Sequence, residues 1–452
     1  MKLLESVRSD PKKQRNWLLI GAVVIFAAGS TMLDGIWQDG AGIAARVFVW
    51  ALIYAFLGAA LLGQMKTAFR ADLFGALLAL LAVTLWIRFP LMSYASKDYV
   101  DCLGEWTAAI RQIPGLRSLG QTIGDYNAPY FYLLFLIAKA VPAAGELYWI
   151  KLFSVAFEAV GAVAVMRLVA LATPRRLAQL GSLFAVLLLP GVILNGSAWG
   201  QCDMVYTALG LLAVYYGLNR QSKLSFLFFA LAFSFKLQTV FFLPVALALL
   251  FTERIRLRDV WVFFAVFLVL LLPAVLAGRP VLETVSIYYK QAAYYEWLHM
   301  NAPTIFGFFA PETGLASFAT AGVFAAGAVV LALVSYLYLR RNRLDTARML
   351  DAAYLSLLII PFFLPHMHER YFFAADVMGA VYLARHPRRW YLPVAAATAS
   401  FLCYFEFLFD QTPAIPLGVL SLAMAVVIGT ILSDLIRSLE TDGGHALREA
   451  CR

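Results

Sequence analysis

Four polar residues stand close together between two apolar segments of this 452-residue chain, in the sequence PHMHERY: His366, His368, Glu369 and Arg370. A His-x-His-Glu pattern could ligate a divalent metal, but it lacks a third strong ligand, so a metal cofactor is the less favoured interpretation. An arginine beside an imidazole is better suited to binding a phosphate bidentately at a membrane surface, with the glutamate orienting either neighbour. The alternative is a helix end whose charges are solvated.

A second polar group lies in the loop at 91–125. From Asp98 onward the pattern is helical and amphipathic, with Asp101 on the polar face, and such a helix would lie in the membrane interface. A carboxylate at the edge of hydrocarbon holds a proton more tightly, which suits a general base. We expect Asp98 to be that base, although it could instead cap the helix. Asp125 and Tyr126, in a turn that leads back into the bilayer, are candidate substrate contacts; Asp101 is a weaker one, because it could simply face solvent.

The third group is the sequence WGQCD at 199–203. Trp199 could stack on the apolar face of a sugar ring, or it could belong to the aromatic belt of the membrane interface. Gln201 offers both a donor and an acceptor, and the glycine between them permits a close turn. Asp203 is costly at a helix mouth unless it has a partner. These three side chains are therefore predicted substrate contacts.

The fourth group is the sequence FKLQ, which contains Lys236 and Gln238. A lysine in the middle of a long apolar stretch is expensive in a membrane, and such residues mark functional sites. The alternative is a lysine at a hairpin tip that extends its ammonium to water. Both residues are predicted to contact the substrate.

The elements that must position these residues are membrane helices. Hydrophobic residues make up 62% of the chain and charged residues 14%, well below the usual charged fraction of soluble domains. We count about fifteen apolar stretches, of which 126–143 or a neighbour is re-entrant or interfacial. The sequence thus predicts an all-α polytopic fold with about fourteen transmembrane helices, in one membrane domain over 1–452. Its parts are three N-terminal helices at 1–90, an outer catalytic loop at 91–125 and the remaining bundle at 126–440.

The net charge of +9 reports membrane topology rather than nucleic-acid binding, because the basic residues form short clusters between apolar runs. Lysine and arginine are retained on the cytoplasmic side. With the clusters and both termini inside, nearly all the unusual polar residues fall on the opposite face. We therefore expect an outward-facing polar site, shared by the acids of the early loop and the bases of the PHMHERY segment.

Four cysteines are too few and too scattered for a disulfide framework or a zinc site. Unpaired thiols are the favoured interpretation. A single bridge between Cys102 and Cys202 is the alternative, because both could face the outer side.

These motifs, taken in order, resemble those of a known superfamily. An aspartate in the first outer loop, GDYNAPYFYLL, WGQCD, a lysine-bearing hairpin and HMHERYF follow one another between about 98 and 371. This order resembles the GT-C superfamily of integral-membrane glycosyltransferases. The most similar group is the bacterial branch related to the GPI-anchor second mannosyltransferase, and a more distant likeness is to the asparagine-linked-glycan glucosyltransferases.

The resemblance implies a GT-C-like helical bundle in a bacterial inner membrane, and a glycosyltransferase that takes a hexose from a polyprenyl-phosphate-linked donor to a glycan or glycolipid acceptor. It implies that Asp98 is the catalytic base, that Asp125 positions substrate, and that His368 with Arg370 contacts the donor phosphate. A polytopic transporter or lipid-linked-sugar flippase is the alternative, although transporters place charges near the midplane and show repeated halves. A third possibility is an O-antigen ligase or polymerase, which would use diphosphate donors.

Overall fold

The computed structural model describes residues 11–38, 42–65, 69–294, 296–412 and 414–440. This part of the chain is almost entirely helical, and its strands are the two-residue segments β1 (His299–Met300) and β2 (Met367–His368). The prediction of an all-α fold is therefore confirmed.

Nine helices among the described residues are long and apolar enough to cross a membrane, which confirms a polytopic membrane protein. A further candidate is the pair Arg176–Leu187 and Pro190–Trp199, which is bent by 46°. Four shorter apolar helices accompany them, at Ala128–Ala140, Asp203–Leu218, Ser222–Phe235 and Leu237–Phe251. The nine candidate spans are Lys13–Trp37, Ile43–Met65, Ala71–Leu91, Ala143–Ala172, Leu257–Leu276, Ala316–Leu339, Thr346–Phe363, Tyr391–Phe409 and Leu417–Glu440.

The contacts within the chain separate two compact units, whose boundaries fall at the end of α5 (Gly104–Gln112), inside α6 (Ala128–Ala140) and inside α10 (Asp203–Leu218). The single domain predicted for 1–452 stays a prediction. The units consist of Met1–Gln112 with Leu136–Met204 (unit 1) and Ile113–Phe135 with Val205–Arg452 (unit 2).

Unit 1 is organised around the long helix α7. The helix α8 packs along α7, α2 packs along α3, and α3 also contacts α7. Short 3₁₀ or π-helical turns, labelled η, interrupt the longer helices. The bounds are α2 (Pro11–Trp37), α3 (Ile43–Met65), α4 (Ala71–Trp86), η1 (Phe89–Leu91), η2 (Tyr99–Leu103), α5 (Gly104–Gln112), η4 (Ala143–Gly145), α7 (Glu146–Ala172), α8 (Arg176–Leu187), α9 (Pro190–Ile193) and η5 (Leu194–Trp199).

Two ion pairs are buried among these helices. Arg88, in the turn after α4, donates from Nε to Glu158 on α7 at 2.7 Å, and its other nitrogens donate to two main-chain carbonyls. Arg46 on α3 pairs with Asp34 on α2 at 2.8 Å. Because an unpaired charge in hydrocarbon is costly, these pairs hold α4 to α7 and α2 to α3.

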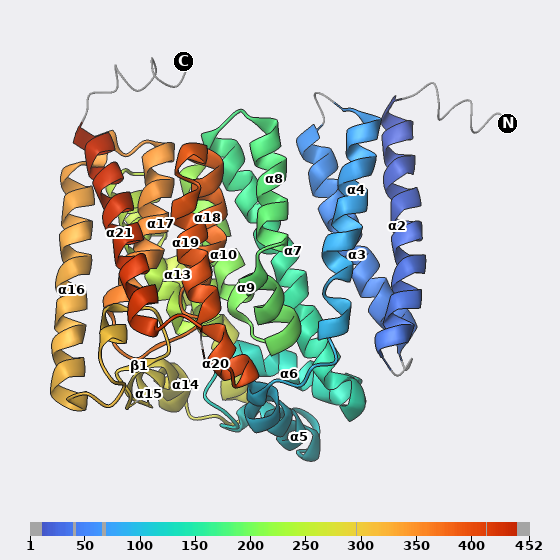
Figure 1. The fold of residues 1–452 in the computed structure, drawn as a ribbon. Coiled ribbons are helices and arrows are strands. Elements are labelled where there is room, and N and C mark those ends of the chain that lie inside the picture. Colours follow the sequence, from blue (N-terminus) through green and yellow to red (C-terminus); the bar gives the residue numbers. More distant parts are fainter. Residues whose placement is uncertain (1–10, 39–41, 66–68, 295, 413, 441–452) are drawn as a thin grey trace. The chain divides into compact units, whose positions relative to one another are not determined.

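Unit 2 contains the remaining helices, and Figure 1 shows β1, α14 and α15 together at one end of them. Its bounds are η3 (Gly115–Gly120), α11 (Ser222–Phe235), η6 (Leu237–Phe242), α12 (Leu243–Phe251), η7 (Leu257–Asp259), α13 (Trp261–Leu276), α14 (Val281–Val285), α15 (Ile287–Tyr294), η8 (Ile305–Phe308), α16 (Leu315–Leu339), η9 (Arg341–Arg343), α17 (Thr346–Phe363), α18 (Phe373–Arg385), η10 (Pro387–Arg389), α19 (Tyr391–Leu402), α20 (Tyr404–Phe409) and α21 (Leu417–Glu440).

The helix α13 carries Pro273 in its interior. A tyrosine hydroxyl from α6 hydrogen-bonds to main-chain groups of α13 beside this proline. The Tyr132 hydroxyl on α6 donates to the Leu270 carbonyl at 2.9 Å and accepts the Ala274 N–H at 3.1 Å. A side chain inserted beside a proline is a recognised way to satisfy the backbone groups that the proline frees. This contact fixes the start of α6, and with it the turn that contains Asp125 and Tyr126.

The buried pair of Arg88 and Glu158 gives a stability prediction. Arg88→Met leaves a buried carboxylate without its cation, so we expect the free energy of unfolding to fall by about 3–5 kcal/mol. The double replacement of Arg88 and Glu158 by Met should recover most of that loss. Denaturant unfolding in detergent measures both variants.

The matched control is Arg70→Met, because Arg70 and Asp72 form an exposed ion pair. Its stability should equal that of the wild type. A double variant as unstable as the single Arg88 variant would contradict this account of the pair.

Candidate functional site

Asp98 lies in the helical turn that begins at residue 97 and leads directly into η2 and then α5, and together these form the predicted amphipathic helix. Its side chain makes no cap hydrogen bond. The Tyr99 N–H instead donates to the Ser96 hydroxyl at 3.3 Å. Ser96 therefore caps the helix, and the cap interpretation of Asp98 is wrong.

The Asp98 carboxylate contacts two other residues that the sequence singled out. The Trp199 indole Nε1 donates to Asp98 Oδ2 at 2.8 Å, and the Gln201 amide donates to the same oxygen. The three residues come from segments about one hundred positions apart, and all belong to unit 1. Two donors on one oxygen fix the orientation of the carboxylate.

Trp199 is fully buried in the structure. Its ring is neither exposed to lipid, as an aromatic belt would require, nor available as an open platform for a sugar. Its indole N–H serves Asp98 instead, so its role in this state is to hold the predicted base.

The turn that presents Trp199 and Gln201 depends on a left-handed glycine. Gly200 has φ of +79° and ends the π-helical turn η5, which confirms the close turn predicted there. The Trp199 carbonyl accepts from the Ser96 hydroxyl at 2.8 Å, and the Gln201 carbonyl accepts from the Ser154 hydroxyl at 2.7 Å. The main chain is thus held on both sides of the glycine.

Asp203 has the partner that its position requires. The Asn195 side-chain amide donates to Asp203 Oδ2 at 2.8 Å, and both residues are buried. The contact joins the start of η5 to the start of α10. Asp203 thus closes the WGQCD turn.

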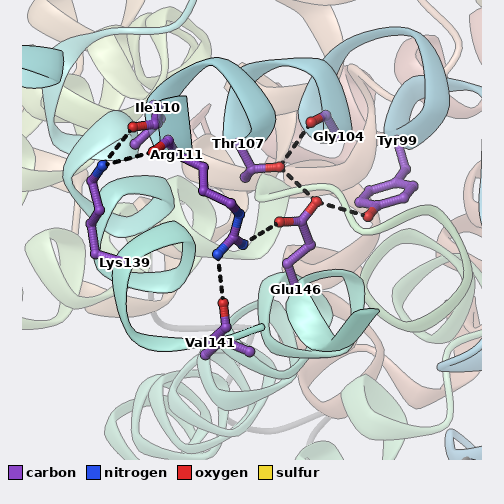
Figure 2. Close-up of polar contacts among 8 residues, drawn as sticks. All are labelled: Tyr99, Gly104, Thr107, Ile110, Arg111, Lys139, Val141 and Glu146. Atoms are coloured by element: carbon purple, nitrogen blue, oxygen red, sulfur yellow. Dashed lines mark hydrogen bonds and ion pairs between the residues drawn. The ribbon is translucent and has the colours of Figure 1, made fainter. Parts of the chain in front are cut away.

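A second carboxylate, Glu146, anchors the helix that follows Asp98, as Figure 2 shows. Its oxygens accept from the hydroxyls of Tyr99 and Thr107 at 3.1 and 2.8 Å and from the Arg111 guanidinium at 2.9 Å. Lys139 adds two bonds, to the carbonyls of Ile110 and Arg111. Burial, together with the negative charge of Glu146, raises the pKa of Tyr99 to about 12, so this phenol remains a donor.

The apolar side of this helix is buried and its acids are exposed. Leu103 and Ile110 face the protein, while Asp101 and Glu105 face outward. The predicted amphipathic pattern is confirmed, and Asp101 lies on the solvent-accessible side.

In unit 2, Lys236 occupies an extended break between α11 and η6. It is only 6% exposed, so it does not reach for water at a hairpin tip. Its ammonium stands 5.4 Å from the centroid of the Tyr126 ring, a cation–π contact between two predicted site residues. Gln238, two residues further on in η6, is half-buried. The side chain of Asp125 is exposed, and its main-chain carbonyl accepts a hydrogen bond from the Gln291 amide.

The PHMHERY segment is held by a parallel strand pair, because β2 pairs with β1. His366 has φ of +61°, and its Nδ1 lies 2.6 Å from the Trp297 carbonyl. Glu369 is buried and accepts from Arg370 at 3.0 Å, with His368 Nδ1 at 3.7 Å. The interpretation of this segment as a solvated helix end is therefore wrong for Glu369.

The lysine segment and the PHMHERY segment lie close together within unit 2. The ring of Phe241, in η6, is 6.4 Å from that of Tyr371, and the Tyr371 ring is 5.2 Å from the His368 imidazole. Within unit 2, aromatic contacts therefore connect η6 to the PHMHERY segment.

Within the described ranges, no group of three or more His, Cys, Asp or Glu residues could hold a metal ion. Cys102 and Cys202 are thiols and are not joined to each other, so the bridge between them is not formed.

Sequence reasoning missed the side chains that support the site. Ser96 offered a signal, since a serine three residues before a helical N–H is a typical cap. Asn195 and Glu146 gave none, because their partners are defined only by the fold.

Glu146→Ala removes the acceptor of three hydrogen bonds and should release η2 and α5. Hydrogen bonds to a charged group contribute about 1.5–3 kcal/mol each, and about 1.4 kcal/mol is a tenfold change. We expect maleimide to label Cys102 at least tenfold faster in a background where the other three cysteines are alanine. Glu105→Ala, an exposed acid on the same helix, should leave the rate unchanged, and equal rates in both variants would contradict the anchoring role.

The ionisation of Glu369 should make the stability of the fold depend on pH. Burial alone would raise its pKa, but the neighbouring His368 and Arg370 outweigh burial and lower it. A lowered pKa stabilises the fold above the ordinary carboxyl value of 4.5, and this contribution is lost as the pH falls through the lowered value. The difference in unfolding temperature between wild type and Glu369→Gln should shrink as the pH falls below 4.5, where the carboxylate takes up a proton; a difference that grew over this range would overturn the assignment.

Each unit thus holds one of the predicted groups: the carboxylate of Asp98 with its two donors in unit 1, and the cations around Glu369 in unit 2. No protein-family model matches the chain. No curated protein is significantly similar to it in sequence.

Proposed function

We propose that this protein is an inverting membrane glycosyltransferase of the GT-C type. It would move a hexose, mannose or glucose, from a polyprenyl-phosphate-linked donor to a lipid-linked or cell-envelope glycan acceptor. The observation that supports this most is the orientation of the Asp98 carboxylate, whose Oδ2 accepts hydrogen bonds from Trp199 and Gln201. The Asp98 side chain makes no hydrogen bond that caps the helix. An oriented carboxylate on an amphipathic helix is what a general base requires.

The chemical step divides between acid and cationic residues. The acceptor hydroxyl oxygen attacks the anomeric carbon, its proton passes to Asp98, and we assign Oδ1 to that proton. The bond from the anomeric carbon to the phosphate oxygen breaks, and polyprenyl phosphate leaves with the electron pair. This leaving group is a weak base, so it needs cationic donors rather than an acid.

The phosphate is assigned to the cations of unit 2. Arg370 and His368 flank the buried Glu369, and Lys236 supplies a further ammonium beside Tyr126. Asp125, His366 and Gln238 would contact the sugar or the acceptor.

The membrane arrangement follows from the same proposal. Together with the nine candidate spans and the bent pair, crossings by shorter helices would give the count of about fourteen transmembrane helices predicted from sequence, with 126–143 or a neighbour re-entrant or interfacial. The α5 helix would lie in the interface, with the site on the periplasmic or outer face and both termini in the cytoplasm of a bacterium.

Asp98→Asn tests the assignment of the base. The protein in detergent is incubated with polyprenyl-phosphate mannose or glucose of short chain length, and with lipid extracted from membranes of cells that lack it. Release of polyprenyl phosphate should fall by about 10²–10⁴-fold in the variant, the range typical of a lost general base. The unfolding temperature should not change.

Glu105→Gln is the control, because this exposed acid stands on the same helix without contacting Asp98. It should retain the wild-type rate. Transfer at full rate by the Asp98 variant would refute the assignment. A wild type that carries lipid-linked sugar across vesicles without releasing polyprenyl phosphate would favour the flippase.

A further inference from the structure

One face of the membrane helix α7 carries three polar residues, Lys151, Ser154 and Glu158, at spacings of three and four. Side chains at these spacings lie one above the other on a helix. All three meet the segment at 195–201. A β-carbon added to Gly200 would lie 3.5 Å from Lys151 Cγ, the Ser154 hydroxyl donates to the Gln201 carbonyl, and Gly196 leaves room for a Glu158 oxygen.

Lys151 also reaches the segment on the other side of the site. Its ammonium donates to the Leu91 carbonyl at 2.9 Å and to the Tyr94 carbonyl, and it stands 5.9 Å from the centroid of the Tyr94 ring. The residues that follow, Ser96 and Asp98, are the cap and the predicted base. Lys151 therefore contacts both segments that meet at Asp98.

Burying the ammonium of Lys151 in a membrane span costs free energy. The side chain is fully buried inside a candidate membrane span. Among the described residues, its recorded partners are these carbonyls and the aromatic ring, and no carboxylate pairs with it. Ionisable residues in such positions are rare and mark functional sites, and a methionine of similar length would be less costly to bury.

We propose that Lys151 is the positioning residue of the Asp98 site, with Ser154 supporting one of its two segments. The lysine fixes the main chain at 91–94, which sets where the Asp98 helix begins, and its stem supports the left-handed Gly200 between the two donors to Asp98. Removing it should let the carboxylate and its donors move relative to each other. The kinetic part of this inference rests on the proposed function, whereas the positioning itself does not.

Lys151→Met tests the proposal in the full-length protein in nanodiscs. The variant keeps the stem of the side chain and loses the ammonium. Hydrogen–deuterium exchange should rise about tenfold in both 91–103 and 195–203, because two carbonyls lose a donor. Ser154→Ala should raise exchange in 195–203 alone.

Lys139→Met is the matched control. Lys139 also donates to two carbonyls in unit 1, but these belong to Ile110 and Arg111 at the far end of α5. Its loss should raise exchange around 104–112 and leave 195–203 unchanged.

Kinetics separate positioning from mere stability. With the polyprenyl-phosphate donor that the wild type uses, Lys151→Met should lower kcat by about tenfold to a hundredfold, the effect of a misplaced catalytic group, with KM for the donor within about twofold. If the wild type transfers neither sugar, the proposed function fails while the exchange measurement still decides the positioning. Unchanged exchange in either segment of the Lys151 variant, or raised exchange with an unchanged kcat, overturns the proposal.

Discussion

A charge buried in hydrocarbon must find its partner within the protein, and this constraint governs unit 1. Arg88 and Glu158 satisfy it as an ion pair that joins α4 to α7, and Arg46 with Asp34 joins α2 to α3. Lys151 satisfies it with main-chain carbonyls. Each contact ties together elements that apolar packing alone would leave able to slide, because the side chains between membrane helices gain little from leaving lipid.

The site around Asp98 depends on these contacts. Main chain that leaves a helix inside a membrane must have its polar groups satisfied by the protein, and the segments at 91–98 and 195–203 meet this need through side chains of α7 and through each other. The polar face of α7 therefore supports irregular main chain beside it. Irregular main chain, in turn, brings an indole and an amide to one carboxylate oxygen.

The sequence allowed several of these features to be predicted, for reasons that are local. Periodicity places Leu103 and Ile110 on the buried side of the helix, a glycine between two polar residues indicates the left-handed turn at Gly200, and a lysine in an apolar run marks the break at Lys236. The supporting residues could not be found in this way. A hydropathy average over a window does not single out the few charged residues of α7, because the stretch around them is apolar. Which of Ser96 and Asp98 caps the helix depends on their contacts with residues about one hundred positions away.

Different contacts orient the two groups of predicted residues, one around Asp98 and the other around Arg370. This difference bears on the chemistry that is proposed for each group. The indole of Trp199 and the amide of Gln201 both donate to Asp98 Oδ2, and these two bonds orient the carboxylate. Arg370 is oriented by Glu369, a buried carboxylate that offsets part of its positive charge. A partly neutralised guanidinium keeps its planar array of donors, and under the proposed function this array would bind the donor phosphate and release it after transfer.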